Sequence, residues 1–205
     1  MSLQTYALFP LNLVLFPGGY LPLRIFETRY LDMVTSCIKN QLPFGVVAVD
    51  DDAYPLKADT LPFAHVGTLA NIVHVDVPQT GLMHIRCEGQ QRFRVKSAHQ
   101  QSDTLWVGEV ELIKDDVELA VPDDLVATSD SLHQLINALI KQGVAEPDIP
   151  ILKPYRFDDC GRVANRWCEL LNLPLKQKQR MLELDSPLIR LELVNDMFAS
   201  SDQDS

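Results

Sequence analysis

The sequence has few basic side chains for its length of 205 residues. Lysine and arginine number 18 against 28 aspartates and glutamates, so the formal net charge is −10. The sequence-independent part of nucleic-acid affinity comes from basic side chains that neutralise phosphates. The charge balance therefore argues against nucleic acid as a partner, although a local basic patch can exist within an acidic total.

The common signatures of nucleotide, metal and nucleophile chemistry are also missing. None of the nine glycines lie two or five residues apart, so G-x-G-x-x-G and the P-loop pattern are absent. The five histidines are never four apart, no cysteine pair has the C-x₂₋₄-C spacing of a zinc site, and G-x-S-x-G does not occur. We expect no catalytic residue, no cofactor and no metal site.

Long hydrophobic runs and closely paired cysteines are absent as well. Residues 1–23 carry no charged side chain, but the first basic residue is Arg24 and prolines interrupt the apolar stretch, which does not fit a secretory leader. No other run approaches the roughly 18 apolar residues of a membrane span. Four scattered cysteines suit a reducing compartment. The expectation is a cytoplasmic protein without a membrane partner.

The first half of the chain has the pattern of short strands around one helix. From Tyr30, apolar residues recur at steps of one, four, seven and eight, which fit one face of a helix of about three turns. That face contains Tyr30, Leu31, Val34, Cys37 and Ile38. β-Branched and aromatic residues, bounded by turn residues, predict the strands. The predicted strands are 6–9, 11–16, 21–26, 44–49, 67–77, 82–88, 91–97 and 105–112.

The pattern changes near residue 115, where an acidic segment with Pro122 leads into helical periodicity. We expect helices at 125–143, at 163–171 and at 175–184, and a last helix that begins at Pro187 after the capping residues Asp185 and Ser186. The predicted organisation is a β-rich part over 1–115, a helical part over 116–199 and a disordered tail over 200–205.

Four stretches of the chain resemble one known family. They are Phe9 to Leu11 with Leu15 to Gly18 and Leu21 to Tyr30, then Gly67 to Ile72, then Gly81 to Phe93, and finally Leu182 to Glu192. Together they are similar to the motifs of the Lon protease N-terminal domain family, in the I-F-E-x-R-Y version of its stand-alone members. Thr80 departs from the acidic residue or asparagine that usually precedes the glycine of the third motif.

The resemblance implies an α+β fold, in which a PUA-like, curled β-sheet or pseudo-barrel with one inserted helix is followed by a helical C-terminal part. In full-length Lon enzymes this region precedes an ATPase module and a Ser-Lys peptidase module, and neither is expected in these 205 residues. The peptidase S16, or ATP-dependent protease La, label would then be a family label only. The implied function is non-catalytic recognition of polypeptide, as a substrate receptor or adaptor for proteolysis and quality control.

Two groups of residues are candidates for the contact with that partner. Gly18, Gly19, Tyr20 and Leu21 form a turn in which an aromatic residue and a leucine follow flexible glycines, as a protein-contact loop requires. The alternative is that Tyr20 and Leu21 fold back onto the sheet. A second group, Glu27, Arg29 and Asp32, could form a charged rim on the helix or simply be solvated.

RNA binding through the sheet is the alternative function. Arg86, Arg92, Arg94 and Lys96 lie on two consecutive predicted strands and could form a basic stripe. Strand alternation places Arg92, Arg94 and Lys96 on one face, which is equally explained as the solvated face. A small ligand in the mouth of the barrel, the oligomeric state and the identity of the partner stay open.

Overall fold

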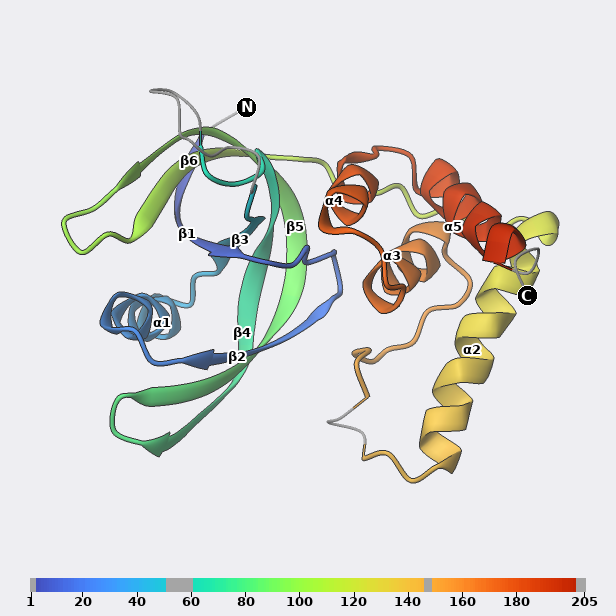
Figure 1. The fold of residues 1–205 in the computed structure, drawn as a ribbon, viewed down its shortest axis with the longest axis horizontal. Coiled ribbons are helices and arrows are strands. Elements are labelled where there is room, and N and C mark those ends of the chain that lie inside the picture. Colours follow the sequence, from blue (N-terminus) through green and yellow to red (C-terminus); the bar gives the residue numbers. More distant parts are fainter. Residues whose placement is uncertain (1–2, 51–60, 146–148, 202–205) are drawn as a thin grey trace. The chain divides into compact units, whose positions relative to one another are not determined.

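A computed structural model describes residues 3–50, 61–145 and 149–201, and its chain divides into two compact units, Met1–Asp115 and Asp116–Ser205 (Figure 1). We refer to them as the β unit and the helical unit. Residues 200 and 201 belong to the last helix, whereas 202–205, the rest of the tail expected to be disordered, lie outside the described residues. None of the helices in the described ranges combines the length and apolar character that a bilayer span requires.

The β unit is a mixed sheet that closes on itself. The strand order is β2-β5-β4-β3-β1-β6, and an additional pairing between β5 and β6 joins β1, β3, β4, β5 and β6 into a ring. β1 and β3 run parallel, and the other pairs are antiparallel. The strands are β1 (Gln4–Leu11), β2 (Tyr20–Ile25), β3 (Phe44–Ala48), β4 (Val66–Gln79), β5 (Leu82–Gln100) and β6 (Trp106–Leu112).

The inserted helix α1 (Thr28–Asn40) confirms the helix predicted from the apolar spacing. Its buried residues Tyr30, Met33, Val34 and Cys37 repeat every three or four positions and pack into the core of the β unit. The helix ends at Gln41, which adopts the left-handed conformation (φ 53°). Ile38 was expected on the buried face but is 45% exposed, because it lies about 100° around the helix from Cys37.

β5 is one continuous strand of 19 residues, so the prediction of two strands broken near Gly89 is wrong. A Cβ atom on Gly89 would lie 2.2 Å from the carbonyl oxygen of Phe16, so only glycine lets the preceding loop approach this closely. The Gly89 N–H donates to the Gly19 carbonyl (2.8 Å), and its carbonyl accepts from the Gly18 N–H (2.7 Å). Gly89 thus anchors the loop and does not end the strand.

The predicted strand 11–16 is also wrong, because β1 ends at Leu11 and the next residues are irregular. Val14, Leu15 and Phe16 are nevertheless buried. Side-chain and backbone bonds hold this loop against the ring: the Thr68 hydroxyl donates to the Leu15 carbonyl over 2.6 Å. The apolar run 11–16 therefore fills the core as a loop, although its composition also fits a buried strand.

Helices make up the regular structure of the described part of the helical unit. Asp159 caps α3 by accepting a hydrogen bond from the Arg162 N–H (2.9 Å). The last helix begins at Pro187, which was predicted from the sequence. The elements are the 3₁₀ helix η2 (Asp123–Leu125), α2 (Val126–Lys141), α3 (Cys160–Leu170), α4 (Leu175–Glu183) and α5 (Pro187–Ser201).

The helical unit is organised around a buried charge that no motif or spacing in the sequence predicted. The Arg190 side chain is 1% exposed and forms an ion pair with Asp116 (2.6 Å). Its guanidinium also donates to the Asn165 side-chain oxygen and to the carbonyls of Met181 and Leu184 at the end of α4. Arg190 therefore supplies hydrogen-bond donors at the end of α4, where a helix turns its last carbonyls toward outside groups.

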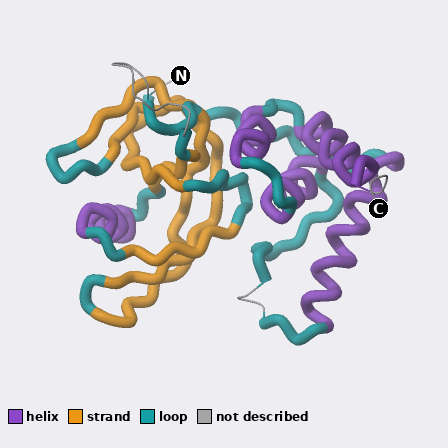
Figure 2. Tube along the Cα trace, in the orientation of Figure 1, coloured by secondary structure: helices purple, strands orange, loops and turns teal. Residues whose placement is uncertain are grey.

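The distribution of strands and helices along the chain is shown in Figure 2. Strands with one inserted helix come first, and helices follow from η2 onwards. The expected α+β fold, in which a curled sheet carrying one helix is followed by a helical part, is confirmed.

Candidate functional site

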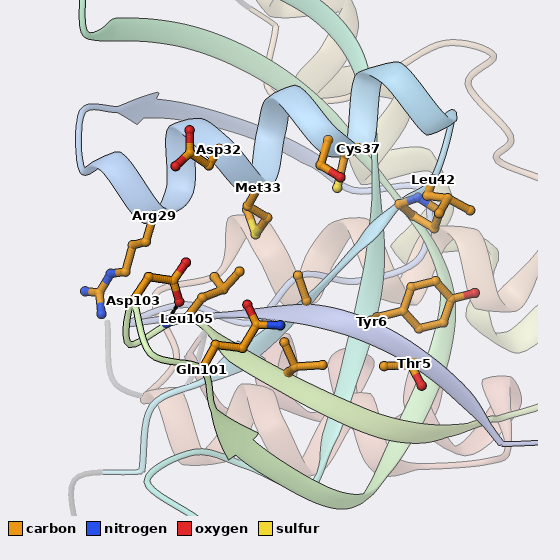
Figure 3. Close-up of a pocket in the computed structure, with 14 residues that line it drawn as sticks. Thr5, Tyr6, Arg29, Asp32, Met33, Cys37, Leu42, Gln101, Asp103 and Leu105 are labelled. Carbon is orange, nitrogen blue, oxygen red and sulfur yellow. Dashed lines mark hydrogen bonds between the residues drawn. The ribbon is translucent and has the colours of Figure 1, made fainter.

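A cavity of about 380 Å³ lies in the β unit beside α1. We call it the α1 groove. Tyr6, Ala7, Met33, Leu105 and Val107 supply apolar lining from β1, α1 and the segment that leads into β6. Its charged lining residues are Arg29, Asp32 and Asp103. Figure 3 shows Met33 and Cys37 pointing from α1 toward the strands, with Arg29 and Asp103 at one end of the groove and Tyr6 and Leu42 at the other.

Arg29 ties α1 to the loop between β5 and β6. Its guanidinium forms an ion pair with Glu27 (2.6 Å) and donates to the Thr104 hydroxyl (2.8 Å) and carbonyl (3.3 Å). The same group lies 4.7 Å from the centre of the Tyr30 ring, within cation–π range. Thr104 has a left-handed backbone (φ 67°), so this contact holds the loop in an uncommon conformation. One end of the groove is thus closed by a fixed cross-link.

The acidic side chains of the rim lie at the surface. Asp32 is exposed on α1. Asp103 is also exposed, and its carboxylate accepts a hydrogen bond from the Leu105 N–H (3.0 Å). Burial raises the pKa of Tyr30 next to the groove, so its phenol stays neutral at physiological pH. The groove therefore combines an apolar interior with a rim that carries the exposed acidic side chains of Asp32 and Asp103.

The structure brings one of the two predicted groups of contact residues to this groove. Arg29 and Asp32 line it, and Glu27 is bound to Arg29 at its end. These are the residues for which the sequence left a rim or simple solvation open.

The second predicted group lies elsewhere in the β unit. Leu21 is 3% exposed and packs in the core, so the expectation that it lies in an exposed loop is wrong. Gly18 and Gly19 are held by their bonds to Gly89, and the half-buried Tyr20 begins β2 opposite Glu88. Tyr20 is separated from α1 by the whole of β2, about 17 Å of extended chain. These residues fold back onto the sheet, the alternative that the sequence left open.

Sequence reasoning missed the groove residues outside α1. Gln101, Asp103 and Leu105 lie about 70 residues along the chain from α1 and reach the groove only because β5 and β6 pair. Leu42, just past the helix, also lines the groove and is 54% exposed. The one indication of this wall in the sequence was Leu42 itself, an apolar residue directly after the polar C-terminal end of the helix.

The residues of the predicted basic stripe do not share one exposed surface. Arg92 is 4% exposed. Lys96 forms an ion pair with Glu111 (2.5 Å), which holds the pKa of that carboxyl below its usual value. Arg94 and Lys96 are exposed, whereas Arg92 is not.

The cysteines offer no nucleophile. All four are free and buried, and burial raises the pKa of Cys87 and of Cys168 to about 12. Their thiols therefore stay protonated at neutral pH, where a thiolate would be needed for attack. Within the described ranges, no cluster of three or more histidine, cysteine or acidic side chains could hold a metal ion.

Known proteins match this chain over nearly its whole length. The profile of the ATP-dependent protease La (LON) substrate-binding domain matches residues 5–200. The chain belongs to this family. Among curated proteins, Lon protease 1 of Myxococcus xanthus is 28% identical over 205 residues, which cover 95% of this chain and 24% of that protein. Protein cereblon of Danio rerio is 31% identical over 62% of this chain and 28% of that protein.

Solved structures show the same fold. The Lon N-terminal domain protein from Xanthomonas campestris superposes with a TM-score of 0.74 at 30% identity, covering 94% of this chain and 98% of that one. The N-terminal domain of a Mycobacterium avium complex Lon protease gives 0.58 at 16% identity, over 94% of this chain and 97% of that one. The chain spans about a quarter of the length of these curated relatives.

Proposed function

We propose that this chain is a non-catalytic, stand-alone polypeptide-binding domain, and that the α1 groove receives apolar side chains of unfolded or extended protein segments. The observation that carries the proposal is the groove itself, which has an apolar interior bordered by exposed Leu42. Large apolar side chains that stay exposed next to a cavity are typical of protein contact sites. The family assignment supports the same function.

The chemistry of the groove suits a partner of variable sequence. Met33 supplies a flexible and polarizable side chain that can adapt to different apolar groups. The cross-link from Arg29 to Thr104 holds one end in place before binding, which lowers the ordering cost of association. The carboxylates of Asp32 and Asp103 favour segments in which a lysine or arginine neighbours the apolar residue.

The biological role that follows is substrate recognition for proteolysis or protein quality control, in the cytoplasm. Lon proteases are among the curated relatives, which supports a role upstream of degradation. RNA binding is not favoured, because the predicted basic stripe is interrupted by the burial of Arg92 and the pairing of Lys96. The protonated buried thiols support a role without catalysis.

Binding of an unfolded protein tests the proposal. The probe is fluorescein-labelled ribonuclease A, reduced and alkylated so that it cannot refold, and the readout is fluorescence anisotropy. Leu42→Asp adds a charge to the apolar border of the groove and should weaken binding at least tenfold, or about 1.4 kcal/mol. The matched control is Ile189→Asp on α5, where the isoleucine is 48% exposed in the helical unit.

The proposal predicts that the control variant binds like the unchanged chain. Circular dichroism spectra establish that both variants are folded. No binding of unfolded ribonuclease A, or equal weakening by both substitutions, would contradict the assignment of binding to the α1 groove.

A further inference from the structure

A second cavity, of about 270 Å³, lies on the other side of α1 in the β unit. It is bordered by the end of the helix, Cys37 to Leu42, and by Asn71 to Val75 of β4. We call it the β4 notch. Ile38, Leu42 and Val73 are all exposed apolar residues at this place. The notch shares Cys37 and Leu42 with the α1 groove, and its other wall is β4.

That strand has an unpaired edge. β3 pairs with β4 only at Thr68, Leu69 and Ala70. From Asn71 to Gln79, β4 pairs with β5 on one side, and no strand of the described ranges pairs with its other side. The hairpin of β4 and β5 extends past the ring in Figure 1. Main-chain donors and acceptors along this edge are therefore available to an added strand.

The hydrogen bonds of Gly89 establish which main-chain groups of β5 point toward β2 and which point toward β4. Both its N–H and its carbonyl bond to the loop on the β2 side. Because main-chain groups alternate along a strand, those of Glu88, Arg86 and His84 point the other way, toward β4. The regular register between β2 and β5 over this stretch contains no bulge that would change the alternation.

The partners of those residues on β4 are Asn71, His74 and Asp76, so the main-chain groups of these three point toward β5. β4 has a register shift between Ile72 and His74, so Ile72 and Val75, three residues apart instead of two, are the residues that point their main-chain groups to the free edge. Their side chains pack against the core on the α1 side. A strand added here would alternate its own side chains between the β4 notch and the opposite face.

The other edge of the same sheet is blocked. β2 is the outermost strand on the β5 side, and Pro22 lies opposite Arg86, at a position that points away from β5. Proline has no N–H to donate, which is a common way to protect an edge strand. No proline occurs between Asn71 and Val77 of β4. On β4 the proline comes only at Pro78, past the notch, so the edge beside the notch keeps its N–H donors, with one register shift between Ile72 and His74.

We propose that an extended polypeptide segment binds by adding a strand to the edge of β4, with its main chain bonded to Ile72 and Val75 and an apolar side chain in the β4 notch. This inference rests on the proposed function and specifies its mode: main-chain bonds supply affinity that does not depend on sequence, and the notch selects an apolar side chain. Such a mode suits a receptor for unfolded chains of many sequences.

Charge around the edge favours one kind of segment. His74 lies opposite Arg86 on the face away from α1, and Lys39 is exposed at the end of the helix. Among the residues that line the notch, none is acidic. A segment with an apolar residue in the notch and a carboxylate next to His74, but not next to the exposed Asp76 two residues further along β4, is therefore complementary to the site.

Amide hydrogen exchange, measured by NMR, tests strand addition directly. The probe is a nine-residue synthetic peptide that alternates valine with threonine or glutamate. The amides of Ile72 and Val75 should exchange at least tenfold more slowly when the peptide is bound, because they become donors to it. The amides of Asn71 and His74, which point toward β5, should change less than twofold.

Backbone methylation of the peptide supplies a second arm. Two versions, N-methylated on odd or on even residues, have the same side chains but block opposite edges of the added strand. One version should lose binding at least tenfold and the other should keep it. Val73→Lys, which places a charge on the β4 edge, should also weaken peptide binding, whereas Val117→Lys, at an exposed valine in the helical unit, should not.

The outcomes separate this inference from the proposed function. If unfolded ribonuclease A binds while exchange at Ile72 and Val75 is unchanged and both methylated peptides bind equally, strand addition is wrong and the proposed function stands. If neither the protein nor the peptides bind, the proposed function itself is wrong. Protection confined to Ile72 and Val75 supports strand addition.

Discussion

The two units differ in where exposed apolar side chains border a cavity and in where a buried charge joins the ends of helices. The β unit leaves apolar Ile38 and Leu42 exposed beside two cavities. The helical unit buries a charge, with Arg190 at 1% exposure bonded to Asp116 and to the carbonyls that end α4. A closed ring of strands satisfies its main chain through ladder bonds, whereas short helices leave terminal carbonyls that need a side-chain donor.

This difference suggests distinct roles for the two units. We propose that residues 1–115 and 116–199 are separate domains, that the first binds polypeptide, and that the second is stabilised by its internal polar network. Each unit contains one of the two tryptophans, Trp106 in the β unit and Trp167 in the helical unit. Replacing either by phenylalanine leaves a fluorescence signal that reports the unfolding of a single unit.

The largest effect is expected from Arg190→Met. The substitution leaves Asp116 and two helix-end carbonyls without their donor, which should cost the helical unit about 3–5 kcal/mol of unfolding free energy. Urea unfolding followed by Trp167 fluorescence measures the loss, and the Trp106 transition should not move. Arg180→Met on the exposed face of α4 is the control, with an expected change below about 0.5 kcal/mol. A loss of similar size in both variants would contradict the role of Arg190.

Gly89→Ala should produce the reverse pattern. The new Cβ would meet the Phe16 carbonyl at 2.2 Å, so the loop before β2 must move, at a cost of about 2–3 kcal/mol to the β unit alone. The Trp106 signal should report this loss. Gly81→Ala at the hairpin turn is the comparison, because a Cβ atom there has no neighbouring atom within 4 Å. Only the backbone strain of alanine at a φ of 80° should destabilise this variant, by about 1 kcal/mol of unfolding free energy. Equal losses at the two glycines would show that the close approach at Gly89 has no energetic weight.

A smaller effect, common to both units, is expected at alkaline pH. Burial raises the pKa of Cys87 in the β unit and of Cys168 in the helical unit to about 12, above the value of 9.0 for a free thiol. Above pH 9 the unfolded chain loses these protons while the folded chain keeps them, so unfolding becomes more favourable. The contribution of each thiol should be complete below pH 9 and should be lost by about 1.4 kcal/mol per pH unit as the pH rises from 9 toward 12.

The cysteine contribution is isolated by substitution. Cys87→Ala should flatten the alkaline slope of the Trp106 transition and leave that of the Trp167 transition unchanged. If the slope of the β unit is the same with and without Cys87, burial of this thiol does not control its alkaline stability.

Periodicity predicted the local elements better than the positions of individual side chains. The spacing of Tyr30, Val34 and Cys37 was sufficient for α1, and Asp185 to Pro187 was sufficient for the start of α5. Gly89 was interpreted as a strand break, because a glycine needed for close approach has the same appearance in a sequence as one that ends a strand.

Buried charges and the groove could not be predicted, because both depend on contacts between distant parts of the chain. Arg92 was interpreted as part of a basic stripe or a solvated face but is buried, and the four partners of the buried Arg190 come from distant parts of the chain. Arg29 was a candidate from the sequence, but its partner Thr104 lies 75 residues away. The α1 side of the groove could therefore be predicted from the sequence, whereas the side formed by the loop between β5 and β6 could not.

Mapping of the bound polypeptide onto the full chain tests the central claim most directly. Unfolded ribonuclease A, reduced and alkylated, is added to the ¹⁵N-labelled protein, and the backbone amide shifts are followed by NMR. We predict that the perturbed amides cluster on α1, at Leu42, at Asp103 to Leu105 and along the β4 edge, while α2 to α5 are unaffected. Perturbations centred on the helical unit, or spread evenly over both units, would contradict the account.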